Sequence, residues 1–162
     1  MNAFDYAIQL ERDGYTFYTQ SAQNISDTSA KRMLLELAED EKKHQVIIQE
    51  LKDGQSVEVG EKISVNVKNV FSELVENNQT LVDDNGTLAE VLTKGSKLEG
   101  EAAELYQGFA DKAESDLEKE TWLKLMEIER KHENLLAMAL EYIEQPNVVL
   151  EDAEFLFYDY DK

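Results

Sequence analysis

The sequence predicts an all-α fold: a four-helix bundle of two antiparallel helix pairs joined by a long crossover. The composition favours helices, because the 162 residues include one Pro and seven Gly, with 42% hydrophobic and 31% charged residues. Four stretches carry apolar residues at steps of three and four, the spacing of one helix face. The chain also repeats itself at an offset of 88 residues, so the second helix pair resembles the first. Its length is that of one domain with a sizeable core.

The first helix is expected over residues 3–24. Its inward face has one acidic residue among apolar and aromatic ones: Phe4, Ile8, Glu11, Tyr15, Tyr18, Ala22 and Ile25. A carboxylate in the middle of an apolar face is unfavourable unless it is paired or bound to a metal ion. Glu11 is therefore a candidate metal ligand.

A cluster of turn and cap residues at 26–29 introduces the second helix, which is expected to end near Lys52 with Gly54 as its C-cap. Polar residues again occupy the centre of the inward face, which reads Leu34, Leu37, Glu41, His44, Ile48 and Leu51. Glu41 and His44 are three positions apart, so they lie on the same helix face and one metal ion can contact both.

Residues 54–86 form the expected crossover segment. Glycines and serines mark its first part as a loop, residues 67–75 fit a short helix, and residues 83–86 fit a turn. The segment is long for a tight hairpin, and its length suits one connection that runs along the bundle.

The third helix is expected over residues 87–113, opened by a capping box from Thr87 to Glu90. Its inward face reads Leu88, Leu92, Glu99, Ala102, Ala103, Tyr106 and Ala110. Gly95, Gly100 and Gly108 lie inside this helix, where each costs about 1 kcal/mol relative to Ala. Close packing against a neighbouring helix is the expected reason for them, and a local bulge in the helix is the alternative.

The fourth helix is expected to begin at a second capping box, from Ser115 to Glu118, and to end before Pro146. Its inward face reads Trp122, Leu125, Glu129, His132, Leu136, Leu140 and Ile143. Residues 1–145 are thus one bundle domain. Residues 146–162 form an acidic tail rich in aromatic residues, expected to pack on its own bundle or on a second subunit.

The repeat brings six candidate metal ligands into correspondence: Glu11, Glu41 and His44 in the first half, and Glu99, Glu129 and His132 in the second. The two histidines are the only ones in the chain. Two divalent cations would balance the four carboxylates, and mixed imidazole and carboxylate ligands suit iron or manganese. Either Glu-x-x-His pair alone fits a solvated charged face, and the whole set also fits a buried polar network without metal.

With these motifs the chain resembles the rubrerythrin-like proteins of the ferritin-like superfamily, over residues 4–144. The resemblance implies two iron ions, with manganese or zinc as other occupants. It implies that Glu41 and Glu129 bridge the ions, that Glu11 and Glu99 are terminal ligands, and that His44 and His132 each donate one nitrogen. It also places Tyr18 and Tyr106 beside the ligands, where they would tune the site without binding metal. Core packing with a hydrogen-bonded hydroxyl explains both tyrosines equally well.

Two departures from peroxide-reducing rubrerythrins are visible. Those proteins carry an additional carboxylate on the third helix, where this chain has Ala102; Glu101 is expected on the wrong face unless a bulge turns it inward. The chain has no Cys and so lacks the rubredoxin iron site of full rubrerythrins. Electrons are therefore expected from an external donor, such as a separate rubredoxin-like protein.

The predicted function is that of a di-iron oxidoreductase, in which peroxide or oxygen oxidises ferrous iron and the external donor reduces it again, in defence against peroxide. The alternative is an iron-binding or ferroxidase-type protein without catalytic peroxide turnover. A third reading is a structural module in which a redox-silent metal such as zinc holds four helices together. The aromatic tail and the family resemblance predict a homodimer.

The charge pattern bears on partners and location. A net charge of -19 argues against nucleic acid and anionic membranes as partners, because phosphate binding needs clustered Lys and Arg. The N-terminal residues have neither the basic start nor the apolar run of a signal peptide, and no stretch is long and apolar enough to span a membrane. A cytoplasmic location is the resulting expectation.

Overall fold

The computed structural model describes residues 2–54, 76–77 and 81–145. Within this part of the chain it contains four long helices and no strand: α1 (Ala3–Gln23), α2 (Thr28–Lys52), α5 (Thr87–Asp111) and α6 (Asp116–Glu144), with a short 3-10 helix, η1 (Asp84–Gly86), before α5. The all-α four-helix prediction is confirmed. The expected short helix at 67–75 and the tail at 146–162 lie outside the described residues.

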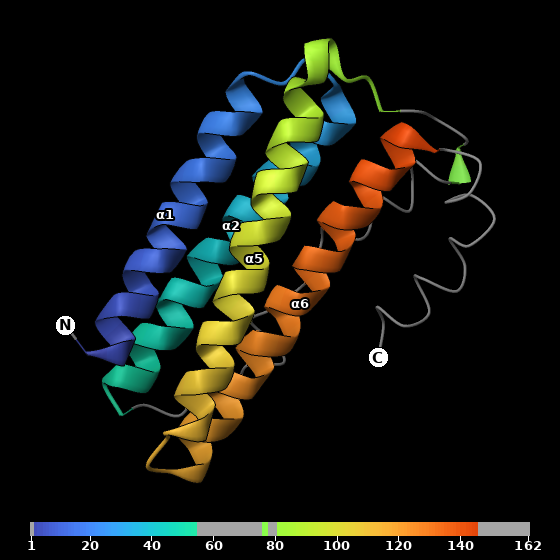
Figure 1. Ribbon diagram of the computed structural model, residues 1–162. Coiled ribbons are helices and arrows are strands. Elements are labelled where there is room, and N and C mark those ends of the chain that lie inside the picture. The colour runs from blue at the N-terminus through green and yellow to red at the C-terminus, as the bar shows by residue number, and fades with distance from the viewer. Residues whose placement is uncertain (1, 55–75, 78–80, 146–162) are drawn as a thin grey trace.

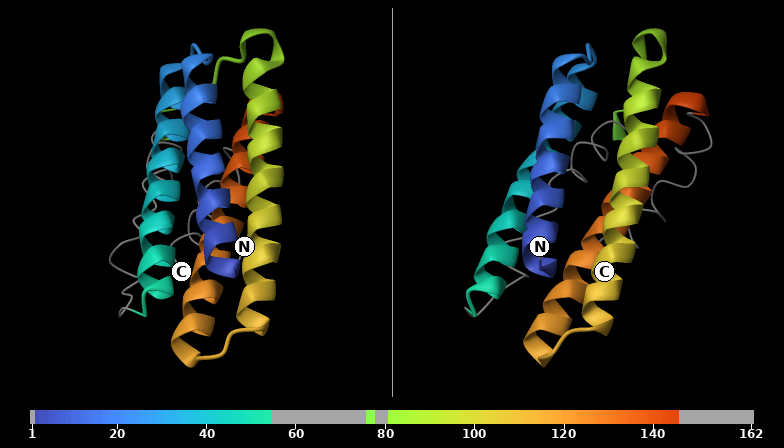
Figure 2. Two further views of the ribbon diagram at one scale, coloured as in Figure 1. Left: turned by 90° about the vertical axis from the view of Figure 1, so that its left-hand side faces the viewer. Right: turned by 60° about the vertical axis from the view of Figure 1, so that its left-hand side comes forward.

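The helices form two antiparallel pairs (Figures 1 and 2). The helix α1 packs along α2, and α5 packs along α6, while α1 lies beside α5 and α2 beside α6. The helix α2 ends at one end of the bundle and α5 begins at the other. Because these two ends are at opposite ends of the bundle, the connection between them has to span its length, as the sequence predicted.

Local signals at the helix ends mostly match the prediction. Asp27 caps α2 by accepting a hydrogen bond from the backbone N–H of Ala30, and Gly54 follows α2 with a φ of 72°, a conformation that glycine adopts easily. Ser115 caps α6 by accepting from the N–H of Glu118, so the second capping box is confirmed on its serine side.

The predicted capping box at Thr87 is wrong. Thr87 is already the first residue of α5, and the N-cap is Gly86, which has a φ of 79° and no side chain to accept a bond. Asp83 takes over this role from the preceding turn, because its Oδ1 accepts from the backbone N–H of Leu88 at 2.8 Å. A carboxylate from outside the helix thus satisfies one of the free N–H groups of its first turn.

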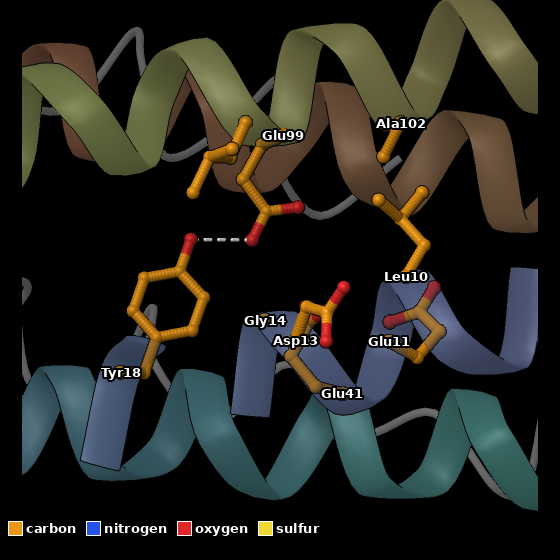
Figure 3. Close-up of a pocket in the computed structure, with 9 residues that line it drawn as sticks. Leu10, Glu11, Asp13, Gly14, Tyr18, Glu41, Glu99 and Ala102 are labelled. Atoms are coloured by element: carbon orange, nitrogen blue, oxygen red, sulfur yellow. Dashed lines mark hydrogen bonds between the residues drawn. The ribbon is translucent and has the colours of Figure 1, made fainter. Parts of the chain in front are cut away.

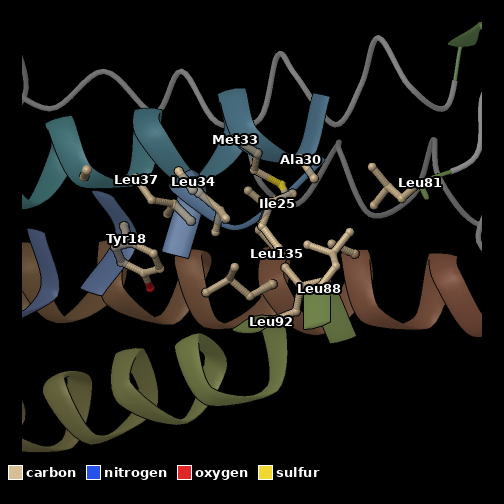
Figure 4. Close-up of a cluster of buried hydrophobic side chains, with 14 of the residues drawn as sticks. Tyr18, Ile25, Ala30, Met33, Leu34, Leu37, Leu81, Leu88, Leu92 and Leu135 are labelled. Carbon is tan, nitrogen blue, oxygen red and sulfur yellow. The ribbon is translucent and has the colours of Figure 1, made fainter. Parts of the chain in front are cut away.

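Two apolar clusters fill the bundle, one on each side of its middle. The first contains residues such as Leu34, Leu92 and Leu136 (Figure 4), and the second contains Ile48, Tyr106 and Trp122. Between them each helix turns polar residues inward. The core therefore encloses a polar layer that both clusters shield from water, which makes charge there costly unless it is compensated.

The inward face of α6 differs from the prediction in its last two turns. Ala139 and Tyr142 are buried there, whereas Leu140 and Ile143 are only partly buried. A helix turns about 100° per residue, so neighbouring positions share the edge of one face and the spacing alone does not separate them. The predicted face is therefore one residue out of register at this end.

Candidate metal centre

All six predicted ligand residues lie in the polar layer, and none is more than 5% exposed: Glu11 on α1, Glu41 and His44 on α2, Glu99 on α5, and Glu129 and His132 on α6. The four helices therefore each contribute at least one carboxylate at the same level of the bundle. The i, i+3 spacing within α2 and within α6 places each Glu and its His on one face.

The six residues form two overlapping groups whose candidate ligand atoms lie within 4.8 Å of one another. One group contains Glu11, Glu41, His44 and Glu129, and the other contains Glu41, Glu99, Glu129 and His132. Glu41 and Glu129 belong to both groups, while each remaining residue belongs to one. This sharing is the arrangement that two bridged metal ions require, although which carboxylates bridge stays a prediction.

The candidate ligand oxygens and nitrogens in this layer lie close to one another, yet many of them have no hydrogen-bond partner. The His44 Nδ1 atom lies 2.8 Å from Glu129 Oε1 and 3.4 Å from Glu11 Oε2, and His132 Nδ1 lies 3.7 Å from Glu99 Oε2. Among the described residues, the buried side-chain atoms without a hydrogen-bond partner include Glu11 Oε2, Glu41 Oε1, both carboxylate oxygens of Glu129, and Nδ1 of both histidines. Such atoms are unfavourable in an apolar core, and two cations bound among them would satisfy them.

The clustering also perturbs the pKa values of these groups in the metal-free protein. Burial, together with the other carboxylates, raises the pKa of Glu41 and of Glu129 well above the usual range. Burial alone would lower the pKa of His44, but Glu11 and Glu129 raise it to about 10. Burial would raise the pKa of Glu99, but its close contacts with Glu129 and His132 and the hydrogen bond from Tyr18 lower it to about 2. The layer thus retains protons in place of cations.

Two tyrosine hydroxyls donate hydrogen bonds to Glu11 and Glu99, the carboxylates that belong to only one ligand group each. The Tyr18 hydroxyl, from α1, donates to Glu99 Oε1 on α5 at 2.6 Å (Figure 3), and the Tyr106 hydroxyl, from α5, donates to Glu11 Oε1 on α1. Both tyrosines are buried, at 1% and 0% exposure. Each hydrogen bond leaves Oε2 of its carboxylate facing the layer, so the tyrosines hold these carboxylates across the gap between the two helix pairs.

Asp40 is a buried residue of this site that the sequence prediction missed. It is 1% exposed, and its Oδ2 lies 3.1 Å from Nε2 of His132. With Nε2–H donating to Asp40, the Nδ1 atom of His132 is left free to bind a metal ion. The repeat offers no counterpart, because the position equivalent to Asp40 is Ile128 and both ring nitrogens of His44 lack a hydrogen-bond partner among the described residues.

No charged side chain occupies the position on α5 where peroxide-reducing rubrerythrins carry their additional carboxylate, as the sequence indicated. Ala102 is buried at the site, whereas the Glu101 side chain is 59% exposed and lies 3.9 Å from Lys97. Ala102 instead helps to line a cavity of about 70 Å³ beside the carboxylates (Figure 3). The cavity is lined by residues of α1, α2 and α5: Leu10, Glu11, Asp13, Gly14, Tyr18, Glu41, Leu98, Glu99 and Ala102.

Gly14 adjoins this cavity and makes room for a ligand residue. A Cβ atom added at this position would lie 2.5 Å from Glu41 Oε2. Two of the three α5 glycines also permit close approach, since a Cβ at Gly95 would lie 3.2 Å from Leu136 and one at Gly100 would lie 2.6 Å from Glu133. Nothing lies within 4 Å of the corresponding point at Gly108, so close packing does not explain that glycine.

Fold and site together define a four-helix carboxylate–histidine protein of the ferritin-like fold. The family model for rubrerythrin matches residues 2–140, and the chain belongs to the rubrerythrin family. No curated protein and no solved structure matches the chain. None of the helices in the described ranges has the length and apolar character needed to cross a membrane.

Proposed function

We propose that this protein is a di-iron oxidoreductase that reduces peroxide or oxygen. The observation that carries the proposal is the pair of overlapping ligand groups, which point unpaired oxygen and nitrogen atoms into one shielded layer. The donor set suits iron, and the rubrerythrin family binds a di-iron site. Bound ferrous iron would supply the electrons for reducing the oxidant.

The chain's own residues would hold and tune this centre. Glu41 and Glu129 would contact both metal ions, while Glu11 and Glu99 would each contact one, held in place by Tyr106 and Tyr18. The cavity of about 70 Å³ is large enough for a small oxidant, because one water occupies roughly 30 Å³ in the liquid. The apolar clusters above and below would keep bulk water away from the reaction.

Iron handling without turnover is the second candidate, and Ala102 favours it. Peroxide-reducing relatives carry a carboxylate at this position, and the chain also has no Cys to hold a rubredoxin iron. In that case the protein would oxidise ferrous iron once and store or release it. Only the oxidoreductase needs its oxidised iron to be reduced again, and a separate protein would be the donor for that step. In both cases the cytoplasm would be the site of action.

Turnover separates the two candidates. Iron-loaded protein is mixed with an excess of hydrogen peroxide and an electron donor, and the peroxide consumed is counted per chain. We expect consumption to continue over many equivalents, since each oxidised centre is reduced again. Consumption that stops after one equivalent per pair of iron ions, with the iron still bound or released as ferric ion, would favour iron handling.

A further inference from the structure

The two halves of the site differ in the aromatic residues that lie beside their tyrosines. Tyr18 and Tyr106 are equivalent in the repeat, and each donates to one unshared carboxylate. Tyr106 lies beside two further rings, Trp122 at a ring-centroid distance of 5.3 Å and Phe109 at 6.4 Å. The repeat places Leu34 at the position equivalent to Trp122 and Ser21 at that equivalent to Phe109. Tyr18 lies among aliphatic side chains (Figure 4), and in the described part of the chain its neighbouring ring is that of Phe17, at a centroid distance of 5.2 Å. A phenyl ring is far harder to oxidise than an indole.

The aromatic contacts continue from Trp122 towards the surface. Trp122 is fully buried and is the only Trp in the chain. Its ring lies 5.1 Å from that of Phe109, and Phe109 lines a surface groove of about 250 Å³ together with Tyr6, which is 51% exposed. The Trp122 indole Nε1–H points to Glu118 Oε1, at 3.4 Å. One aromatic path therefore joins the carboxylate of Glu11 to an accessible face.

We propose that Tyr106 and Trp122 form a one-electron relay between the metal centre and the groove lined by Tyr6 and Phe109. The relay rests on the proposed function, because it has a task only when the centre reacts with an oxidant. It carries single electrons inward from a small one-electron donor at the groove. Tyr18 takes no part in it, because Leu34 stands where a second Trp would be needed.

When oxygen is the oxidant, the two ferrous ions supply too few electrons, and the relay would supply the rest. Reduction of O₂ to two molecules of water takes four electrons and four protons, and two of the electrons come from oxidation of two ferrous ions. The balanced step is O₂ + 2 Fe²⁺ + 2 e⁻ + 4 H⁺ → 2 Fe³⁺ + 2 H₂O, with the protons drawn from solvent. The relay supplies the other two electrons one at a time. With peroxide, H₂O₂ + 2 Fe²⁺ + 2 H⁺ → 2 Fe³⁺ + 2 H₂O balances without it.

The relay residues return to their starting state after each electron has passed. When Tyr106 gives up an electron, its phenolic proton moves to Glu11, its hydrogen-bond acceptor. Trp122 then reduces Tyr106, the proton returns to the phenol, and the indole proton moves to Glu118. The donor at the groove, such as ascorbate, finally reduces Trp122, which regains its proton.

The first test detects the radicals. Ferrous-loaded wild type, Trp122→Phe, Tyr106→Phe and Tyr18→Phe are mixed with oxygen, freeze-quenched and examined by electron paramagnetic resonance. Because Trp122 is the only Trp, growth on ring-deuterated tryptophan labels that residue alone, and narrowing of the signal assigns it. We expect an indole radical in the wild type, its loss in both relay variants, and no organic radical in wild type given one equivalent of peroxide without oxygen.

The Tyr18→Phe variant is the matched control, since it removes the equivalent hydrogen bond at the other carboxylate. A loss of the radical in Tyr18→Phe equal to that in Tyr106→Phe would overturn the relay, as would an unchanged signal in Trp122→Phe. Iron per chain and the melting temperature, measured on the same samples, show that each variant is folded and loaded.

A second test needs no metal and separates failure of the relay from failure of the proposed function. Metal-free protein is oxidised by a flash-generated ruthenium(III) polypyridyl complex, which is too large to enter the bundle. An indole radical in transient absorption, absent from Trp122→Phe, is expected and supports the outer half of the relay even if iron does not bind. Folded wild type that gives no indole radical here contradicts the relay whatever its iron content.

Discussion

At the scale of single residues, the two histidines differ in whether a neighbouring side chain orients the ring. Asp40 holds His132 by its Nε2 atom, whereas no described residue holds His44 in this way. An orienting carboxylate of this kind is worth roughly 10–100-fold in metal affinity. Asp40→Asn should therefore weaken binding of the metal ion on the His132 side by that factor and leave the His44 side less affected.

Metal titration followed by the fluorescence of Trp122 measures this effect. Glu39→Gln is the matched control, because it removes the same charge from the neighbouring, exposed position. Two equal binding steps in Asp40→Asn, each as tight as in the wild type, would show that Asp40 does not position a ligand.

Proton binding by the ligand residues should make the stability of the metal-free protein depend on pH. Folding raises the pKa of His44 from 6.5 to about 10, so its contribution is complete below pH 6.5 and is lost as the pH rises through about 10. The raised pKa values of Glu41 and Glu129 act in the same direction, since their ionisation in the core is unfavourable. The melting temperature of metal-free protein should therefore fall as the pH is raised from 6.5 towards 10.

Zinc-loaded protein is the comparison for this measurement. A bound metal ion keeps its ligands deprotonated, so its presence should remove most of the pH dependence in this range. A melting temperature of the metal-free protein that rises with pH would contradict the arrangement of charges described for the centre.

At the scale of elements, Gly14 on α1 tests how closely two helices must approach at the site. Gly14→Ala should stabilise the metal-free helix by up to about 1 kcal/mol, because Ala is the better helix former. The new Cβ would, however, force the Glu41 carboxylate to move, since the two would lie only 2.5 Å apart. We expect weaker metal binding together with equal or higher stability of the metal-free protein, measured by titration and thermal melting.

Gly108→Ala supplies the control for that substitution. It makes the same change inside a helix, at a point with nothing within 4 Å. It should give the gain in stability without the loss of metal affinity. Equal metal affinity in both variants would show that Gly14 is not needed for the placement of Glu41.

The elements also show what sequence reasoning can reach. The four helices and the six inward polar residues were predictable, because a charged residue at the centre of an apolar stripe has few explanations. Asp40 was not, because it lies beside Glu41 in a run of charged residues, and its contact with His132 on another helix cannot be read from the spacing. The start of α5 was misplaced for a similar reason: Asp83, outside the helix, does what Thr87 was expected to do.

At the scale of the whole molecule, we expect a homodimer, on the basis of the aromatic residues in the tail at 146–162 and the resemblance to paired bundles. A net charge of -19 on each chain opposes association, and salt screens this repulsion. Sedimentation at micromolar concentration should therefore detect a dimer whose fraction increases with ionic strength. A monomer at every salt concentration would contradict the expectation.

The central claim is that Glu41 and Glu129 are shared between two metal ions, and iron content tests it most directly. Iron per chain is measured after anaerobic loading of wild type, Glu129→Ala and Glu99→Ala, with the melting temperature of each protein with and without iron. We expect two iron ions in the wild type, a greater loss in Glu129→Ala than in Glu99→Ala, and stabilisation by iron that disappears with the bridge. Two iron ions bound normally by Glu129→Ala, with wild-type stabilisation, would contradict the claim.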